Sequence, residues 1–205
     1  MRLRLLGAFA LERAGRAVEL PMSSQRLLAF LALQRRPVLR VFAAGSLWLD
    51  AAEDRAGACL RSVLWRLQLP DHGLVDVSNN HLALAPGVEV DLSRSLGLAQ
   101  RVLTSSAELD DLEQAPEELS IDLLPYWYED WVLVERERFR QLRLHALEAL
   151  CEQLTALGRF DHAVEAGIAA VAGRAAARER APGPDPGAPD GGELRGGRAA
   201  VPVLS

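Results

Sequence analysis

Residues 50–70 have the sequence DAAEDRAGACLRSVLWRLQLP, which has the periodicity of an amphipathic helix. The pattern predicts a helix over residues 52–69, capped by Asp50 and ended by Pro70. Acidic residues in its first turn and arginines further along suit the helix dipole. The face predicted to be buried consists of Ala56, Leu60, Val63, Leu64 and Leu67. The opposite face presents Arg55, Ala58, Cys59, Arg61, Ser62, Trp65 and Arg66.

Short strands and two helices are predicted before this helix. Apolar residues alternate or cluster over residues 3–11 and 17–20, as in short strands, and the N-terminal segment is interpreted as the first strand. A helix capped by Ser23-Ser24 follows and runs to Leu33, with an apolar stripe at helical spacing. A second, shorter helix is expected over residues 41–47.

A hairpin is predicted after the helix. Residues 73–92, GLVDVSNNHLALAPGVEVDL, contain two alternating strands around Asn79-Asn80, a pair that tolerates positive φ in a tight turn. The hairpin spans residues 74–85, and a third strand is expected over 88–91. Strands, three helices and a hairpin in this order are typical of a winged helix, so residues 1–91 are predicted to form an α+β winged-helix domain. In such domains the third helix enters the DNA major groove and the hairpin is the wing.

Residues 92–172 are predicted to form an all-α domain. DLSRSLGLAQRVL, residues 91–103, is one amphipathic helix, followed by an acidic loop over 105–118 and a long leucine-rich helix over 131–157. GRFDHAVEAGIAAVA, residues 158–172, is typical of half a tetratricopeptide repeat, with alanines as small packing residues. One half-repeat cannot bury its face alone, so this tetratricopeptide-like domain is predicted to be incomplete.

Two clusters in the helical domain are interpreted as structural. The aromatic residues Tyr126, Trp127, Tyr128 and Trp131 are expected to pack in the core of this domain rather than to form a ligand cage. Residues 135–138, Glu-Arg-Glu-Arg, are expected to be a solvated helix surface with paired charges.

The charge of the chain is unevenly distributed. The net charge is −5, and all 23 basic residues are arginines. Residues 1–70 contain 11 arginines and 5 acidic residues, whereas residues 71–172 contain 7 arginines and 19 acidic residues. A basic first third joined to an acidic middle favours a polyanion-binding domain attached to a partner domain that does not bind polyanions.

The candidate DNA contacts come from the predicted third helix and the hairpin. Arginine can bind guanine or phosphate through two hydrogen bonds, and a serine hydroxyl can contact either. The arginines of the helix either contact DNA or are simply a solvated helix face. Trp65 either packs beneath the hairpin or touches DNA, and the residues at the tip of the hairpin either contact DNA or are plain turn residues. The candidates are Arg55, Arg61, Ser62, Trp65, Arg66, Asn79, Asn80 and His81.

Several other functions lack the residues that they require. No run of 18 apolar residues is present, so no membrane span is predicted, and the expected location is the cytoplasm. Cys59 and Cys151 lie far apart, and the four histidines have no metal-ligand spacing. The sequence has no glycine-rich phosphate loop, nucleophile elbow or Cys-His arrangement. We therefore predict no catalytic residues, no metal and no cofactor, and a protein that is not an enzyme.

Two segments carry a family resemblance. QRLLAFLAL, then LW with an acidic residue, then RAGACLRSVLWRL resemble the DNA-binding half of the Streptomyces antibiotic regulatory protein family. DLLPYWYEDWVLVERERFRQLRLHALEAL is similar to the bacterial transcriptional activator domain of that family. The resemblance covers residues 1 to about 172, and the segment 39–42 departs from the polar residues that the family often has there. It implies an OmpR-type winged helix, an activator of secondary-metabolite genes, binding to direct repeats near promoters, contact with RNA polymerase holoenzyme and self-association on DNA.

Residues 173–205 break the resemblance. They contain 7 glycines, 5 prolines and no aromatic residue, which predicts a disordered tail. A frameshift after about residue 172 is the second interpretation, because GC-rich codons for this segment, read one base later, can encode an amphipathic helical hairpin. The alternative function is then a truncated protein-interaction module with weak or no DNA binding.

Overall fold

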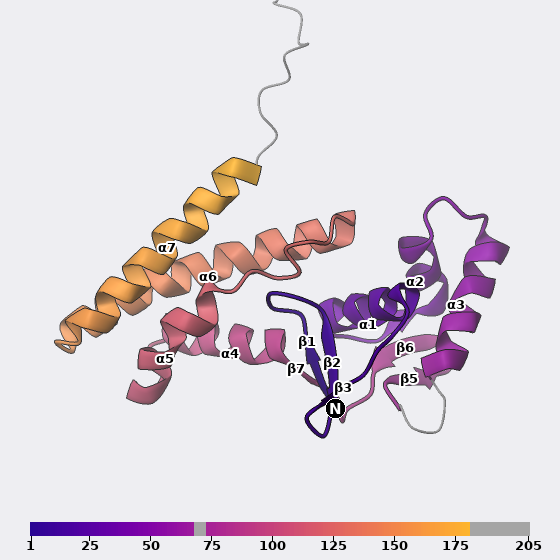
Figure 1. Ribbon diagram of the computed structural model, residues 1–205, viewed down its shortest axis with the longest axis horizontal. Coiled ribbons are helices and arrows are strands. Elements are labelled where there is room, and N and C mark those ends of the chain that lie inside the picture. Colours follow the sequence, from indigo (N-terminus) through magenta and orange to yellow (C-terminus); the bar gives the residue numbers. More distant parts are fainter. Residues whose placement is uncertain (68–72, 181–205) are drawn as a thin grey trace, which may run out of the picture.

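The chain has a small β-sheet region at its N-terminus followed by a helical region (Figure 1). The structure is a computed structural model and describes residues 1–67 and 73–180. The strands are β1 Arg2–Arg4, β2 Ala10–Arg13, β3 Arg16–Ala17, β4 Val38–Leu39, β5 Val75–Ser78, β6 His81–Leu84 and β7 Glu89–Val90. The helices are α1 Met22–Gln34, α2 Arg40–Leu47, α3 Glu53–Leu67, α4 Asp91–Leu103, α5 Leu109–Ser120, α6 Asp130–Ala156 and α7 Phe160–Arg180. Within the described ranges, no helix has both the length and the apolar character needed to cross a membrane.

The strands form two small sheets. The first has the order β3-β2-β1-β7, with β1 antiparallel to β2 and parallel to β7. The predicted first strand is thus two strands, because the chain turns back at a loop in which Gly7 has a φ of 79°. The second sheet has the order β4-β6-β5. Sequence analysis missed β4, which has only two residues and pairs with β6.

Two predicted helix caps are wrong. Helix α1 begins at Met22 directly after Pro21, whose φ of −58° already suits a helix start, so Ser23 and Ser24 lie inside the first turn. Helix α3 begins at Glu53, and its first bond runs from the Ala56 amide to the Ala52 carbonyl, which leaves Asp50 in the preceding turn. The predicted end of this helix, residues 68–70, lies outside the described residues.

Asp91 begins α4 instead of ending a strand. Its carboxylate accepts hydrogen bonds from the amides of Leu5 at 2.9 and 3.0 Å, Leu6 at 3.0 Å and Leu92 at 2.7 Å. Burial raises the pKa of the Asp91 carboxyl, and these amides together with the charge of Arg4 oppose that rise. Because the raised pKa favours the protonated folded form, this titration stabilises the fold at low pH, and that contribution is lost as the pH rises through the folded pKa.

We expect Asp91→Ala to lower the free energy of unfolding by about 1–3 kcal/mol at neutral pH, because the buried Leu5 amide and its neighbour lose their acceptor. Urea unfolding followed by circular dichroism measures this change. The exposed Asp76 on β5 gives the control, since Asp76→Ala is expected to change stability by less than about 0.5 kcal/mol. Equal stability of the two variants would show that the hydrogen bonds between the Asp91 carboxylate and the amides of residues 5 and 6 do not stabilise the fold.

A helix occupies most of the predicted acidic loop. Helix α5 buries Leu112, Ala115 and Leu119, three residues at helical spacing, against α6 and α7. Pro116 lies inside this helix and is itself buried, so the helix forms despite one missing backbone donor. The prediction of a loop was wrong because tertiary contacts outweigh the acidic composition.

Helix α7 continues past the predicted boundary at residue 172. The segment GRAAARER, residues 173–180, is helical because alanine, arginine and glutamate favour helices, and the first proline comes only at residue 182. Gly173 is buried against α6, where a Cβ would lie 2.9 Å from Leu144 Cδ2. The prediction of a disordered tail is therefore wrong for residues 173–180, and residues 181–205 lie outside the described part.

The larger hydrophobic core joins the N-terminal region to the start of the helical region. It includes Leu123, Leu124 and Phe139 together with the N-terminal helices. Trp127 stacks on Phe9 with ring centroids 5.9 Å apart, and Trp131 meets Phe30 edge-on at 5.4 Å. The aromatic cluster was thus placed in the wrong core, and only half of it is packed, because Tyr126 and Tyr128 are exposed.

Arg136 and Arg143 are buried, and the burial of Arg136 corrects the prediction that residues 135–138 are all solvated. Arg136 Nε donates to the Leu123 carbonyl at 2.7 Å, and its Nη2 donates to the carbonyls of Leu124 and, at 2.7 Å, Trp127. Arg143 Nη1 donates to the carbonyls of Leu119 and Ser120. The two arginines therefore hold the irregular segment between α5 and α6. Arg138 does form the expected exposed pair with Glu135.

Candidate nucleic-acid interface

Helix α3 has one buried face and one exposed face, as predicted. The structure buries Ala56, Leu60, Val63, Leu64 and Leu67. The five candidate contacts on this helix are all exposed: Arg55, Arg61, Ser62, Trp65 and Arg66. Trp65 is 69% exposed, so it does not pack beneath the hairpin. The exposed face of α3 thus presents one aromatic ring, one hydroxyl and three guanidinium groups to solvent.

The arginines lie on two flanks of this exposed face. At about 100° per residue, Ser62 and Trp65 point away from the core, Arg55 and Arg66 share one flank, and Arg61 lies on the other. From Arg55 to Arg66 the helix rises about 16 Å at about 1.5 Å per residue. The major groove of B-DNA is about 12 Å wide, so a face of this length can contact both its floor and the phosphates at its edges.

The hairpin turn lies beside the start of α2. Asn79, with a φ of 44°, and Asn80 form the two-residue turn between β5 and β6, and both are exposed, as is His81. The Arg40 amide donates to the Asn80 carbonyl at 2.9 Å, and Leu39 is paired with His81 across the sheet. Figure 1 shows the hairpin next to the C-terminal end of α3. The three hairpin candidates therefore lie together at a tip that is hydrogen-bonded to α2.

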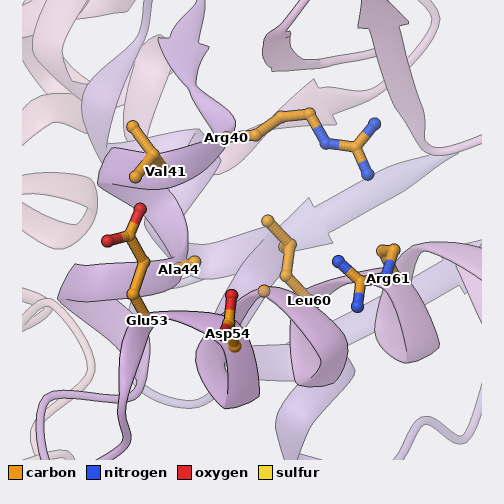
Figure 2. A pocket seen from close by; sticks show the side chains of 8 residues that line it. Arg40, Val41, Ala44, Glu53, Asp54, Leu60 and Arg61 are labelled. Atoms are coloured by element: carbon orange, nitrogen blue, oxygen red, sulfur yellow. The ribbon is translucent and has the colours of Figure 1, made fainter.

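Arg40 connects the two groups of candidates. Its side chain and that of Arg61 line one pocket of about 420 Å³ between α2 and α3. Figure 2 shows both guanidinium groups on one side of this pocket and the Glu53 carboxylate on the other. The glycine at position 57 leaves room for Arg61, whose Nη1 lies 3.4 Å from the place where a Cβ would stand.

Four guanidinium groups of this surface have no protein partner among the described residues. No hydrogen bond or ion pair within residues 1–67 and 73–180 engages the side chains of Arg40, Arg55, Arg61 and Arg66. By contrast, Arg26 on α1 is engaged, because its Nε lies 3.0 Å from a Glu129 oxygen and its Nη2 donates to the Leu47 carbonyl. Uncommitted guanidinium groups can donate to phosphate oxygens or to guanine without first breaking a bond in the protein.

No family model matches this chain, and no curated protein matches it either. The family resemblance therefore stays an expectation from the sequence. Within the described residues, no group of three His, Cys, Asp or Glu side chains is placed to hold a metal ion. The chemistry that this surface offers is hydrogen-bond donation to a polyanion.

Sequence analysis missed Arg40 as a candidate contact. Residues 39–42 stand out in the sequence only as a departure from the family pattern. The place of Arg40 in this surface depends on β4, which brings residue 40 to the tip of the hairpin. A strand of two residues has too little periodicity to be detected in the sequence. The available signal was an arginine directly after two β-branched or aliphatic residues at the start of a predicted helix.

Proposed function

We propose that this chain is a sequence-specific DNA-binding transcription regulator. In this proposal residues 1–91 are a winged helix, α3 is its recognition helix and the β5–β6 hairpin is its wing. One observation carries the proposal: α3 exposes three arginines that have no partner among the described residues, beside a hairpin tip joined to the start of α2. The basic charge of residues 1–70 supports it, since phosphate neutralisation supplies much of the affinity for DNA.

The helical region fits the activator domain of the regulatory family that the sequence resembles. Helices α6 and α7 pack side by side (Figure 1), and Ala163, Ala166 and Ala170 are buried in the core that α7 shares with α5 and α6, as small residues of tetratricopeptide-like helices are. On this resemblance we propose that the protein acts in the cytoplasm, binds direct repeats near promoters and contacts RNA polymerase. The acidic charge of residues 71–172 is consistent with a region that does not bind DNA.

A binding-site selection tests the proposed function. Duplexes with a randomised central region are incubated with the full chain, and the bound fraction is amplified, sequenced and footprinted. We expect one enriched motif and a protected region over it, with an affinity at least about 10³ times that for unrelated DNA. Recovery of no motif, together with equal affinity for all duplexes, would contradict sequence-specific binding.

Arg40→Ala is expected to weaken binding to the selected duplex by about fivefold to tenfold and to weaken binding to unrelated duplexes by the same factor. A residue at the start of α2 is placed to meet the DNA backbone rather than the bases, and a phosphate contact contains no sequence information. Fluorescence anisotropy over a salt series measures both effects, and the slope of log affinity against log salt should fall by about 1. A loss confined to the selected duplex would instead make Arg40 a base contact.

A further inference from the structure

Helix α7 has an apolar seam that no other described residue covers. Four large apolar side chains along this helix are between 60% and 67% exposed. They are Phe160, Val164, Ile168 and Val171. Steps of four, four and three residues place them in one line along the helix, away from the alanines that face α5 and α6. We call these four residues the α7 seam.

The chain that follows α7 is poorly suited to cover the seam. In stacked helical repeats, the next helix buries such a face. Here residues 181–189 contain four prolines, and residues 181–198 contain one aliphatic residue larger than alanine, Leu194. That composition offers few side chains that could cover an apolar face. A straight line of apolar side chains fits a second helix with the same line.

We propose that the α7 seam is the surface through which two copies of this chain associate, with seam packed against seam. A two-fold pair needs only one patch, because each copy presents the same surface to the other. Each of these side chains offers on the order of 100 Å² of apolar surface, so two seams bury on the order of 800 Å². Because stable complexes bury at least about 1,200 Å², the dimer is weak and reversible. The association does not depend on DNA binding.

Sedimentation velocity of the full chain over about 1–500 µM, without DNA, tests the proposal. We expect the average mass to rise with concentration from that of one chain toward that of two. The variant Val164→Glu/Ile168→Glu is expected to raise the dissociation constant at least tenfold, since it places four carboxylates in the interface of the pair. Both positions are exposed in the single chain, so the fold is expected to persist, which far-ultraviolet circular dichroism checks.

The matched control is Leu133→Glu/Val134→Glu, which adds the same charge at two exposed apolar positions of α6, outside the seam. It is expected to associate like the unchanged chain. Three results would overturn the proposal: a wild-type chain that stays monomeric throughout, a seam variant that associates like wild type, or equal loss in the seam variant and the control. The first would leave residues 199–204 of the same chain, AAVPVL, as the occupant to test.

Discussion

Arg136→Met is expected to lower the free energy of unfolding by about 3 kcal/mol. Arg136 is 7% exposed and donates to the carbonyl oxygens of Leu123, Leu124 and Trp127. Methionine fills much of the same volume but leaves the carbonyls of Leu123 and Trp127 without a donor, at about 1–3 kcal/mol for each, whereas the Leu124 carbonyl keeps its bond from the Trp127 amide. The loss is partly offset because a buried guanidinium no longer has to give up its hydration. Urea unfolding, followed by tryptophan fluorescence, measures the change.

Arg138→Met is the matched control for Arg136→Met. Arg138 lies two residues further along α6, its side chain is 71% exposed, and it is paired with Glu135 one turn away. Loss of an exposed pair of this kind changes stability by less than about 0.5 kcal/mol. If both variants unfolded at the same urea concentration as the unchanged chain, the hydrogen bonds of Arg136 would contribute nothing to the stability of this junction.

The best-predicted elements are those whose own side chains fix their burial. The buried stripe of α3, the bounds of α4 and the position of the β5–β6 turn all follow from local periodicity and turn residues, and all are confirmed. The coarse order, β-sheet region and then helical region, is confirmed for the same reason. The patterns that predict these elements lie entirely within about 10 to 20 consecutive residues.

The errors concern residues whose environment comes from distant parts of the chain. Nothing near Arg136 in the sequence shows that it is buried, because its acceptors belong to a segment that is bonded to residues 5–7, directly after β1. Trp131 was assigned to the helical domain, although its ring meets Phe30, which is about 100 residues earlier in the chain. Helix α5 was missed because it has only four buried residues, one of them a proline, and because five acidic residues lie among its first ten positions.

The residues of the candidate site also divide into those placed by local periodicity and those placed by contacts with distant parts of the chain. Helical periodicity placed the exposed face of α3 correctly, so Arg55, Arg61 and Arg66 were found from the sequence. Arg40 joins them only through the pairing of β4 with β6 and the bond from its amide to Asn80, neither of which has a sequence signature. That these residues bind DNA stays a prediction, and their substitution has the largest effect on affinity that we expect.

Arg61→Ala/Arg66→Ala is expected to lower the affinity for the selected duplex by about 30-fold to 10⁴-fold. Each base contact made by an arginine contributes about 1–3 kcal/mol, and tenfold in affinity corresponds to about 1.4 kcal/mol. The two losses should nearly add, because the residues lie on different flanks of α3 and share no partner among the described residues. Anisotropy titrations of selected and scrambled duplexes at one salt concentration measure the effect.

The control has to remove the same charge elsewhere in the basic region. Arg16→Ala/Arg36→Ala does so: both residues are exposed, Arg16 belongs to the other sheet, and Arg36 precedes β4 at the end away from the hairpin tip. Loss of two positive charges alone reduces the long-range attraction to DNA. It therefore lowers the affinity for selected and scrambled duplexes alike. The α3 variant should lose far more affinity for the selected duplex than for the scrambled one. If the two double variants bound the selected duplex equally well, α3 would not be the recognition helix.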